Sequence, residues 1–200
     1  MKFISLLNEL KSSFGEDILI RKNGAVLLKP GRVPICRHEL FSPLKQEYIE
    51  TYFVNQYSNE FPQEYIDFLR NFNGANLFNI KFLLKPEGFE FGQSMLTLFG
   101  LPLSPPNPEI RDVNGEEPFD LRVEDTDRHK NVPRTWLKCG CFLSNKDYRT
   151  IMDIFIDTTS HKVFVCEKRK SKIEYEWDNL DSALCDIFEL LSNCDEVIVV

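Results

Sequence analysis

The sequence predicts an α+β protein in which a mostly antiparallel sheet carries helices packed on one of its faces. Apolar residues recur at helical spacing early in the chain, over 3–14, 44–57 and 62–72. From residue 80 onward they mostly alternate with polar residues, which is the period of strands, until a last helical stripe over 180–191. Helices first, then a run of strands, then a closing helix is an order typical of helices segregated on one side of a sheet.

The N-terminal part of the chain is predicted to form one helix and one hairpin. The helical stripe over 3–14 is followed by two short apolar runs, Ile18–Ile20 and Val26–Leu28. Asn23-Gly24 lies between these runs, and this dipeptide favours a tight hairpin turn. Residues 30–41, which contain two prolines and a glycine, are predicted to be a connection.

Two more helices follow. Ser42-Pro43 offers an N-cap residue and a proline in the first helical position, which predicts a helix running to about Tyr57. In the next helix Pro62 suits the first turn, because the missing N–H of proline would have no partner there. The apolar stripe of this helix consists of Tyr65, Phe68, Leu69 and Phe72. Asn73-Gly74 then supplies residues that tolerate the left-handed conformation used to end a helix.

The second half of the chain is predicted to be a series of strands with one long interruption. Strand patterns occur near 80–84, 95–99, 136–143, 152–156, 163–165 and 173–177, and the closing helix follows. Residues 102–135 are rich in proline and acidic residues and form a predicted irregular insertion. We divide the chain into an N-terminal extension, 1–41, and a domain, 42–200, which contains this insertion.

Composition narrows the class of protein. The chain has 200 residues, a net charge of −7, a pI of about 5.1 and 17 phenylalanines, so a sizeable core is expected. An acidic protein is unsuited to general nucleic-acid binding, which needs a basic face. The N-terminal residues do not resemble a secretory signal, and no apolar run reaches the ~20 residues of a membrane span. We therefore expect a cytoplasmic protein whose six cysteines are reduced, with no membrane partner and no direct nucleic-acid partner.

The sequence contains no motif of a known catalytic chemistry. There is no G-x-S-x-G, H-E-x-x-H or P-loop pattern, so we predict a non-enzymatic protein with no catalytic residues, metal or cofactor. Cys36 and His38 lie two residues apart, but a metal site needs further ligands that the sequence does not place. Cys139 and Cys141 would share one face of a strand, and buried packing is the preferred interpretation of both thiols. A small hydrolase or transferase with an unrecognised acidic site is the enzymatic alternative.

The acidic part of the insertion is the predicted partner-binding site. It contains Asp112, Glu116, Glu117, Asp120, Glu124, Asp125 and Asp127. One interpretation is a solvated loop without a function of its own. The other is an electrostatic patch for a basic partner, with Trp136 as an adjacent apolar anchor. Trp136 is equally compatible with burial, and Trp177 is expected in the core because it lies on an alternating strand.

One stretch, FPQEYIDFLRNFNGA, resembles the (L/F)P-x-x-Y-x-x-F-L-x-x-x-N-G element of the SUKH superfamily. The branch that it is most similar to is typified by a fungal cell-wall-synthesis regulator. Later features agree in order, including the strand with an acidic turn at Ile154–Asp157 and the closing helix, so the resemblance covers roughly 42–192. The residues that carry the motif are Phe61, Pro62, Tyr65, Phe68, Leu69, Asn73 and Gly74.

This resemblance implies an α+β binding domain. Bacterial members of the superfamily are immunity proteins that bind and neutralise a cognate toxin, often a nuclease. The resemblance therefore implies that this chain binds a toxin domain as its protein partner. Fungal relatives imply an alternative, a regulatory adaptor that has no toxin partner.

Overall fold

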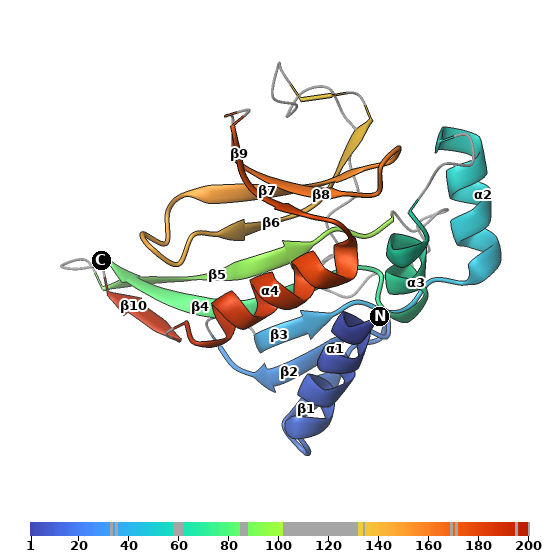
Figure 1. Ribbon diagram of the computed structural model, residues 1–200. Helices are drawn as coiled ribbons and strands as arrows, with labels where there is room; N and C mark the ends of the chain where they lie inside the picture. The colour runs from blue at the N-terminus through green and yellow to red at the C-terminus, as the bar shows by residue number, and fades with distance from the viewer. Residues whose placement is uncertain are drawn as a thin grey trace.

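A computed structural model describes residues 1–32, 34, 36–57, 62–84, 88–101, 132–133, 135–168, 170, 172–194 and 196–199. Four helices lie in this part of the chain, and Figure 1 shows their arrangement. They are α1 (Lys2–Ser13), α2 (Gln46–Tyr57), α3 (Gln63–Asn71) and α4 (Leu180–Ser192). No helix among the described residues is long and apolar enough to cross a membrane.

The strands of the described chain form a single sheet in the order β1-β2-β3-β4-β5-β6-β7-β8-β9, with every neighbouring pair antiparallel. A tenth strand, β10, pairs with β4 in parallel. The strands are β1 (Ile18–Ile20), β2 (Val26–Pro30), β3 (Cys36–Leu40), β4 (Ala75–Leu84), β5 (Phe89–Leu98), β6 (Trp136–Leu143), β7 (Ile151–Asp157), β8 (Val163–Glu167), β9 (Ile173–Trp177) and β10 (Val197–Val199). The predicted α+β class with a mostly antiparallel sheet is confirmed.

Helices α1, α3 and α4 lie on the same side of the sheet (Figure 1). Aromatic side chains join this layer, since the ring of Phe3 on α1 lies 6.2 Å from Phe68 on α3 and 6.0 Å from Phe188 on α4. Phe188 in turn lies 4.9 Å from Phe78 of β4. The main core is therefore a layer of helices on one sheet face, and it exists because each helix has one apolar stripe.

The N-terminal helix and hairpin form as predicted, but residues 30–41 are not only a connection. They include β3, which pairs with β2 on one side and with Glu39 and Leu40 against the start of β4 on the other. This strand was not predicted because Arg37, His38 and Glu39 are three consecutive polar residues and give no alternating strand pattern. The hairpin loop is also longer than a two-residue turn, because Arg21 pairs with Ala25 around three loop residues.

Helix α2 begins at Gln46, so Ser42 is not its N-cap as predicted. The Ser42 hydroxyl instead donates a hydrogen bond to the carbonyl of Asn23 at 2.7 Å and ties the strand end to the hairpin loop. Helix α3 agrees more closely with the prediction. Pro62 precedes it as the N-cap residue, and Tyr65, Phe68 and Leu69 are buried.

A bulge separates the two thiols of β6, which were expected to share one face. The register of β6 against β7 shifts between Lys138 and Gly140, so one residue is inserted on the β6 side. As a result Cys139 belongs to the main core, while Cys141 lies opposite Asp153 of β7. The extra residue changes the alternation of side chains, which a regular strand pattern cannot anticipate.

Two features of the sheet position the candidate sites. Strand β5 is followed after Leu101 by the predicted insertion, and the chain returns through residues 132–135 to the neighbouring strand β6. Strand β4 is ten residues long and has two different neighbours on one side, β3 at its start and β10 at its end. The sheet therefore forks along β4.

Candidate partner-binding site

The seven predicted acidic contact residues, Asp112, Glu116, Glu117, Asp120, Glu124, Asp125 and Asp127, lie outside the described residues. So does Phe61, the first residue of the motif. The described chain does contain both ends of the acidic insertion, and Trp136 lies at the second end. We call these ends, residues 98–101 and 132–138, the root of the insertion.

The first end of the root is held by residues of the sequence motif. The hydroxyl of Tyr65 donates a hydrogen bond to the carbonyl of Phe99 at 2.6 Å. The side-chain amide of Asn73 donates to the carbonyl of Leu101 at 2.9 Å, and its oxygen accepts from the Leu101 N–H at 2.7 Å. Asn73 is 2% exposed, so it pairs with the Leu101 backbone away from solvent, as a neighbouring strand would.

Two glycines allow the close approach of this segment to the end of α3. Gly74 has φ +97°, and a Cβ there would lie 2.7 Å from the Leu98 carbonyl oxygen. A Cβ on Gly100 would lie 2.2 Å from the carbonyl oxygen of Asn73, a distance that no real side chain tolerates. Asn73-Gly74 therefore does more than end a helix, since it brings the chain against residues 98–101.

Trp136 lies at the second end of the root, in an aromatic cluster. Its ring stacks on Phe164 of β8 with 4.2 Å between centroids and an interplanar angle of 6°, and lies 5.9 Å from Phe155 of β7. It is half-buried, so one part of the indole packs on the sheet and another part is accessible. Trp136 is therefore partly packed on the sheet, and its role as an anchor for a partner stays a prediction.

Backbone hydrogen bonds join the two ends of the root to each other and to the sheet. The Phe99 N–H donates to the Cys139 carbonyl at 3.0 Å, and the Thr158 N–H donates to the Thr135 carbonyl at 2.8 Å. The Trp136 N–H donates to the Pro133 carbonyl at 3.1 Å. Both ends of the insertion are therefore tied to the sheet where β5 ends and β6 begins.

A buried ion pair lies beside the root. The Lys138 ammonium is 2.9 Å from Asp153 Oδ1, and the side chain of Asp153 is only 1% exposed. The same ammonium lies 5.6 Å from the centroid of the Phe99 ring. Lys138 thus links the two ends of the root electrostatically, and no spacing in the sequence reveals this contact.

Asp153 belongs to a row of polar residues that crosses the sheet opposite the main core. Cross-strand pairing places Glu39, Asn76, Thr97, Cys141, Asp153 and Cys166 directly opposite one another in turn. The Asn76 amide donates to Glu39 Oε2 at 3.1 Å, and Arg21 lies 3.5 Å from Glu39 Oε1. Single polar residues in apolar strands were the only signal for this row.

The thiols near the root are poor nucleophiles at neutral pH. Burial raises the pKa of Cys139 to about 12 and that of Cys141 to about 11. His38 is buried too, and its Nδ1 accepts a hydrogen bond from the Phe78 N–H at 3.2 Å. No group of three or more His, Cys, Asp or Glu side chains able to hold a metal occurs among the described residues.

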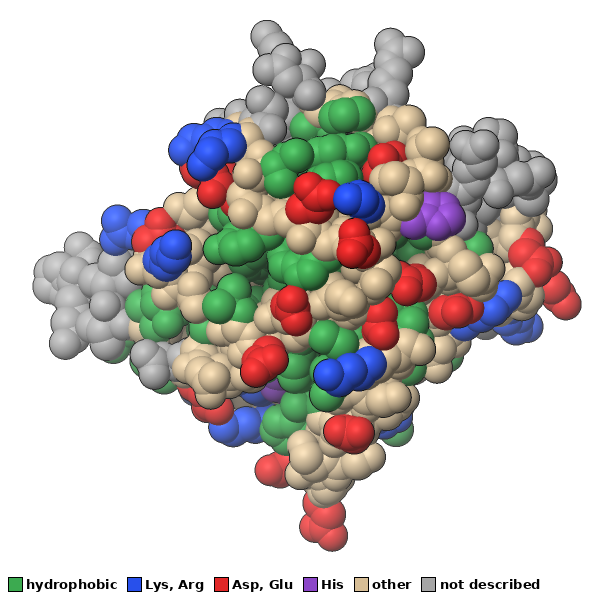
Figure 2. All heavy atoms as spheres, viewed as in Figure 1, with side chains coloured by type: hydrophobic (Ala, Val, Ile, Leu, Met, Phe, Trp, Pro, Cys, Tyr) green, Lys and Arg blue, Asp and Glu red, His purple; other side chains and the backbone are tan. Residues whose placement is uncertain are grey.

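The outer face of the helix layer has a mixed chemistry. Figure 2 shows acidic and basic side chains interspersed with hydrophobic ones on this face, without one large area of a single charge. Edge strand β9 is more exposed than predicted, since Ile173 and Tyr175 are each 43% exposed. Trp177 is half-buried and donates its indole N–H to Asp186 of α4 at 2.8 Å.

A hollow lies at the fork of the sheet, between β3 and β10. It has a volume of about 190 Å³ and is lined by Lys29, Pro30, Gly31, Pro34, Cys36, Arg37, Asn79, Lys81, Glu196 and Val197. None of these residues was predicted to form a site. They come from four strands and their flanking turns, and no short-range spacing in the sequence brings them together.

Comparison with known proteins returned no match to a family model, to a curated protein or to a solved structure.

Proposed function

We propose that this protein is a non-enzymatic immunity protein of the SUKH superfamily, which neutralises a cognate bacterial toxin in the cytoplasm by direct binding. The contact surface is the acidic insertion together with Trp136. The observation that carries the proposal is that the motif residues Tyr65 and Asn73 hold residues 99–101, where the insertion begins.

This arrangement supports a division of labour between scaffold and contact surface. The motif helix α3 packs its apolar stripe into the core and uses its polar residues to hold one end of the insertion. Trp136 holds the other end by stacking on Phe164. Related immunity proteins would then differ in the sequence of the insertion and share the scaffold, because binding residues concentrate on loops held by rigid elements.

Charge supplies the mechanism of inhibition. A nuclease toxin needs a cationic groove for phosphate, and a chain of net charge −7 with acidic residues on a long insertion complements such a groove. Long-range attraction would mainly raise the association rate, while an apolar anchor such as Trp136 would slow dissociation. Occupying the groove inhibits the toxin without any chemical step.

The test uses the product of the gene directly upstream, which the proposal expects to be a toxin domain; an isolated gene would favour the adaptor interpretation. Co-expression with this protein should restore growth, and the two proteins should form a one-to-one complex whose affinity falls as salt rises. Neutralising Glu116, Glu117, Glu124 and Asp125 to the corresponding amides should weaken the complex at least tenfold and flatten its salt dependence.

A charge-matched control variant carries four glutamines at Glu9, Glu16, Glu47 and Glu189, all exposed on other elements. It should bind like the unmodified protein. Equal effects of the two variants would reject the acidic insertion as the contact surface. Failure to restore growth, with no complex formed, would reject the toxin partner and favour the adaptor interpretation.

A further inference from the structure

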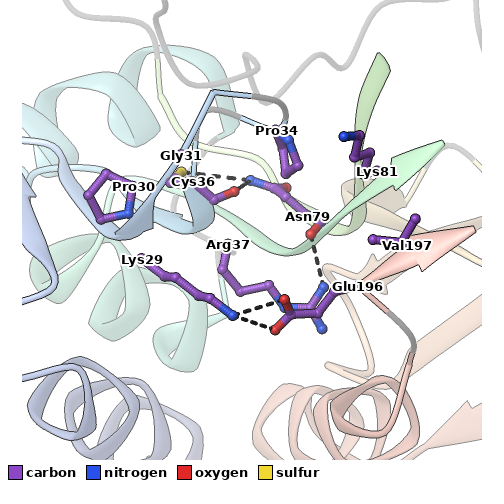
Figure 3. A pocket seen from close by; sticks show the side chains of 10 residues that line it. All are labelled: Lys29, Pro30, Gly31, Pro34, Cys36, Arg37, Asn79, Lys81, Glu196 and Val197. Atoms are coloured by element: carbon purple, nitrogen blue, oxygen red, sulfur yellow. Dashed lines mark hydrogen bonds and ion pairs between the residues drawn. The ribbon is translucent and has the colours of Figure 1, made fainter. Parts of the chain in front are cut away.

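The hollow at the fork of the sheet results from unequal strand lengths. β3 pairs with β4 only at Ala75 and Asn76, whereas β10 pairs with β4 at Lys81–Leu83. The intervening part of β4 is in ladder register with neither strand and is joined to β3 by side-chain hydrogen bonds instead, and the side chain of Arg37 enters this space (Figure 3). We call this hollow the fork pocket.

The fork pocket is cationic. Lys29, Arg37 and Lys81 line it with one acidic lining residue, Glu196, and Lys81 is itself paired with Glu90 of β5 at 2.7 Å, outside the lining. Arg37 donates one N–H to the Asn79 carbonyl at 2.9 Å and another to the Cys194 carbonyl at 3.3 Å. A guanidinium has five N–H groups, so among the described residues these two bonds fix its position and leave donors for an anion.

The Arg37 guanidinium is also partly removed from water. Burial lowers its pKa, and the nearby carboxylate of Glu196 opposes this shift. A half-buried cation of this kind is stabilised by an anion at close range, more than an exposed cation would be. An anion bound in the fork pocket would therefore stabilise the charged form of Arg37.

Glu196 already supplies one. Both of its carboxylate oxygens lie 2.8 Å from the Lys29 ammonium, as the paired dashed lines in Figure 3 show. Lys29 and Arg37 together lower the pKa of Glu196, so it stays ionised at neutral pH. The Lys29 and Glu196 side chains are 50% and 55% exposed, and ion pairs so open to water contribute little to stability.

We propose that the fork pocket binds small carboxylates and that Glu196 occupies it as an internal competitor. The Glu196 carboxylate is the template for the ligand, since it shows which group Lys29 binds beside the Arg37 guanidinium. Pro30, Pro34 and Val197 offer an apolar wall for a short carbon chain beside that group. This site is separate from the acidic insertion and does not depend on the toxin-binding proposal.

The remaining polar group of the pocket is held in place. The Asn79 side-chain amide donates to the Cys36 carbonyl at 3.0 Å, and its oxygen accepts from the Ser94 hydroxyl at 2.6 Å. β10 is also fixed independently of the Glu196 side chain, because the Lys81 N–H donates to the Glu196 carbonyl at 2.9 Å. Displacement of the Glu196 carboxylate therefore leaves β10 paired.

Competition by a tethered group makes a quantitative prediction. A side chain on a short tether acts at a local concentration in the millimolar range or above, and a free carboxylate must displace it. The apparent affinity is then reduced by the fraction of pockets that are open. Removing the internal carboxylate should restore the intrinsic affinity.

The experiment titrates acetate and butyrate into the full chain and follows the backbone amide signals of Lys29, Asn79 and Lys81 by NMR at constant ionic strength. Glu196→Gln, which keeps the shape of the side chain, should lower the Kd for both carboxylates at least tenfold. Butyrate should bind more tightly than acetate because of the apolar wall.

The matched control is Glu176→Gln on β9, which removes a carboxylate from another exposed ion pair, with Lys162 at 2.7 Å. Its Kd should equal that of the unmodified protein. Equal Kd values for Glu196→Gln and Glu176→Gln would overturn the proposal.

A second pair of variants distinguishes loss of the binding site from loss of the fold. Lys29→Gln in the Glu196→Gln background changes only an exposed side chain, and it should raise the Kd again by tenfold or more. Arg37→Gln in the same background should abolish binding. Unchanged carboxylate binding by the Lys29 variant would overturn the site, and equally tight binding of inorganic phosphate would overturn the assignment to carboxylates.

Discussion

At the scale of single residues, His38 should make the stability of the protein depend on pH. Burial, together with the charges of Arg37 and Lys29, lowers the pKa of His38 to about 3. In the unfolded chain a histidine has a pKa of about 6.5. The folded state therefore keeps His38 neutral where the unfolded state binds a proton.

Because of this difference, the free energy of unfolding falls as the pH falls. The full contribution of His38 to stability is present above pH 6.5 and is lost progressively as the pH falls from 6.5 towards 3. Urea unfolding at pH 7.5 and pH 5.0 should show a loss of about 2 kcal/mol from this group. His38→Gln should remove that pH slope, whereas replacing the exposed His161 by asparagine should keep it. An unchanged slope in His38→Gln would contradict the assignment.

Asn73 should be the residue of the motif whose loss most disturbs the root of the insertion. Asn73→Ala removes both hydrogen bonds to Leu101 and leaves buried backbone groups without their partners. We expect a loss of about 3 kcal/mol in the free energy of unfolding. Hydrogen exchange at the Leu101 N–H should accelerate as well.

The matched control for Asn73 is Asn71, the last residue of α3, two positions earlier in the chain. Asn71 is exposed, and its amide bonds only to the Asp67 carbonyl one turn earlier, at 2.9 Å. Asn71→Ala should change stability by less than about 0.5 kcal/mol. Similar effects of the two substitutions would argue that the Asn73 to Leu101 contact does not hold the root.

At the scale of secondary-structure elements, carboxylates connect three helices end to end. Glu64 on α3 accepts hydrogen bonds from the Leu180 and Asp181 N–H groups at 2.7 Å and 3.3 Å, at the start of α4. Asp181 in turn accepts from the Lys2 and Phe3 N–H groups, both at 2.8 Å, at the start of α1. Each carboxylate meets the positive end of a neighbouring helix.

Loss of the Glu64 carboxylate should therefore destabilise α4 and not α3 alone. Glu64→Ala should lower the free energy of unfolding by about 1–2 kcal/mol. Glu64→Gln, which keeps an acceptor but not the charge, should cost less. Thermal unfolding measures both, and Glu47→Ala in the exposed first turn of α2 should be nearly neutral. A neutral Glu64→Ala would refute this helix connection.

The same elements show how far local sequence signals reach. The stripe of α3 predicted that helix closely, because this signal acts within a few residues. The helix ends at Asn71, before the Asn73-Gly74 doublet, and its C-cap Phe72 is extended instead of left-handed. The start of α2 and the strand β3 were mispredicted. Ser42 serves a loop nineteen residues away, and β3 is stabilised by pairing with β2 and β4 in spite of its polar residues.

At the scale of the whole molecule, the rate at which each cysteine reacts with a thiol reagent measures how well the fold protects it from solvent. All six cysteines are free, and Cys36, Cys139 and Cys166 are buried. Because burial raises the pKa of Cys139 to about 12 and of Cys141 to about 11, neither forms thiolate readily at pH 7.5. A thiol reagent should label the buried Cys139 only as fast as the protein unfolds.

Peptide mapping after a short exposure to iodoacetamide would check this expectation. The denatured chain should incorporate label at all six positions, which also tests that no disulfide forms. Rapid labelling of Cys139 in the native protein would contradict its burial. The exposed side of the molecule offers the comparison, because Cys185 and Cys194 are only half-buried.

The sequence by itself determined the fold class, the order of most elements and the position of the motif helix. These properties depend on periodicity, turn residues and helix ends, which are encoded over three to fifteen neighbouring residues. The tertiary structure alone decided that Asn73 holds Leu101, that Lys138 pairs with Asp153 and that Lys29, Arg37 and Glu196 meet at the fork of the sheet. Those contacts join residues far apart in the chain, and only the register of strands around one core brings them within hydrogen-bonding distance.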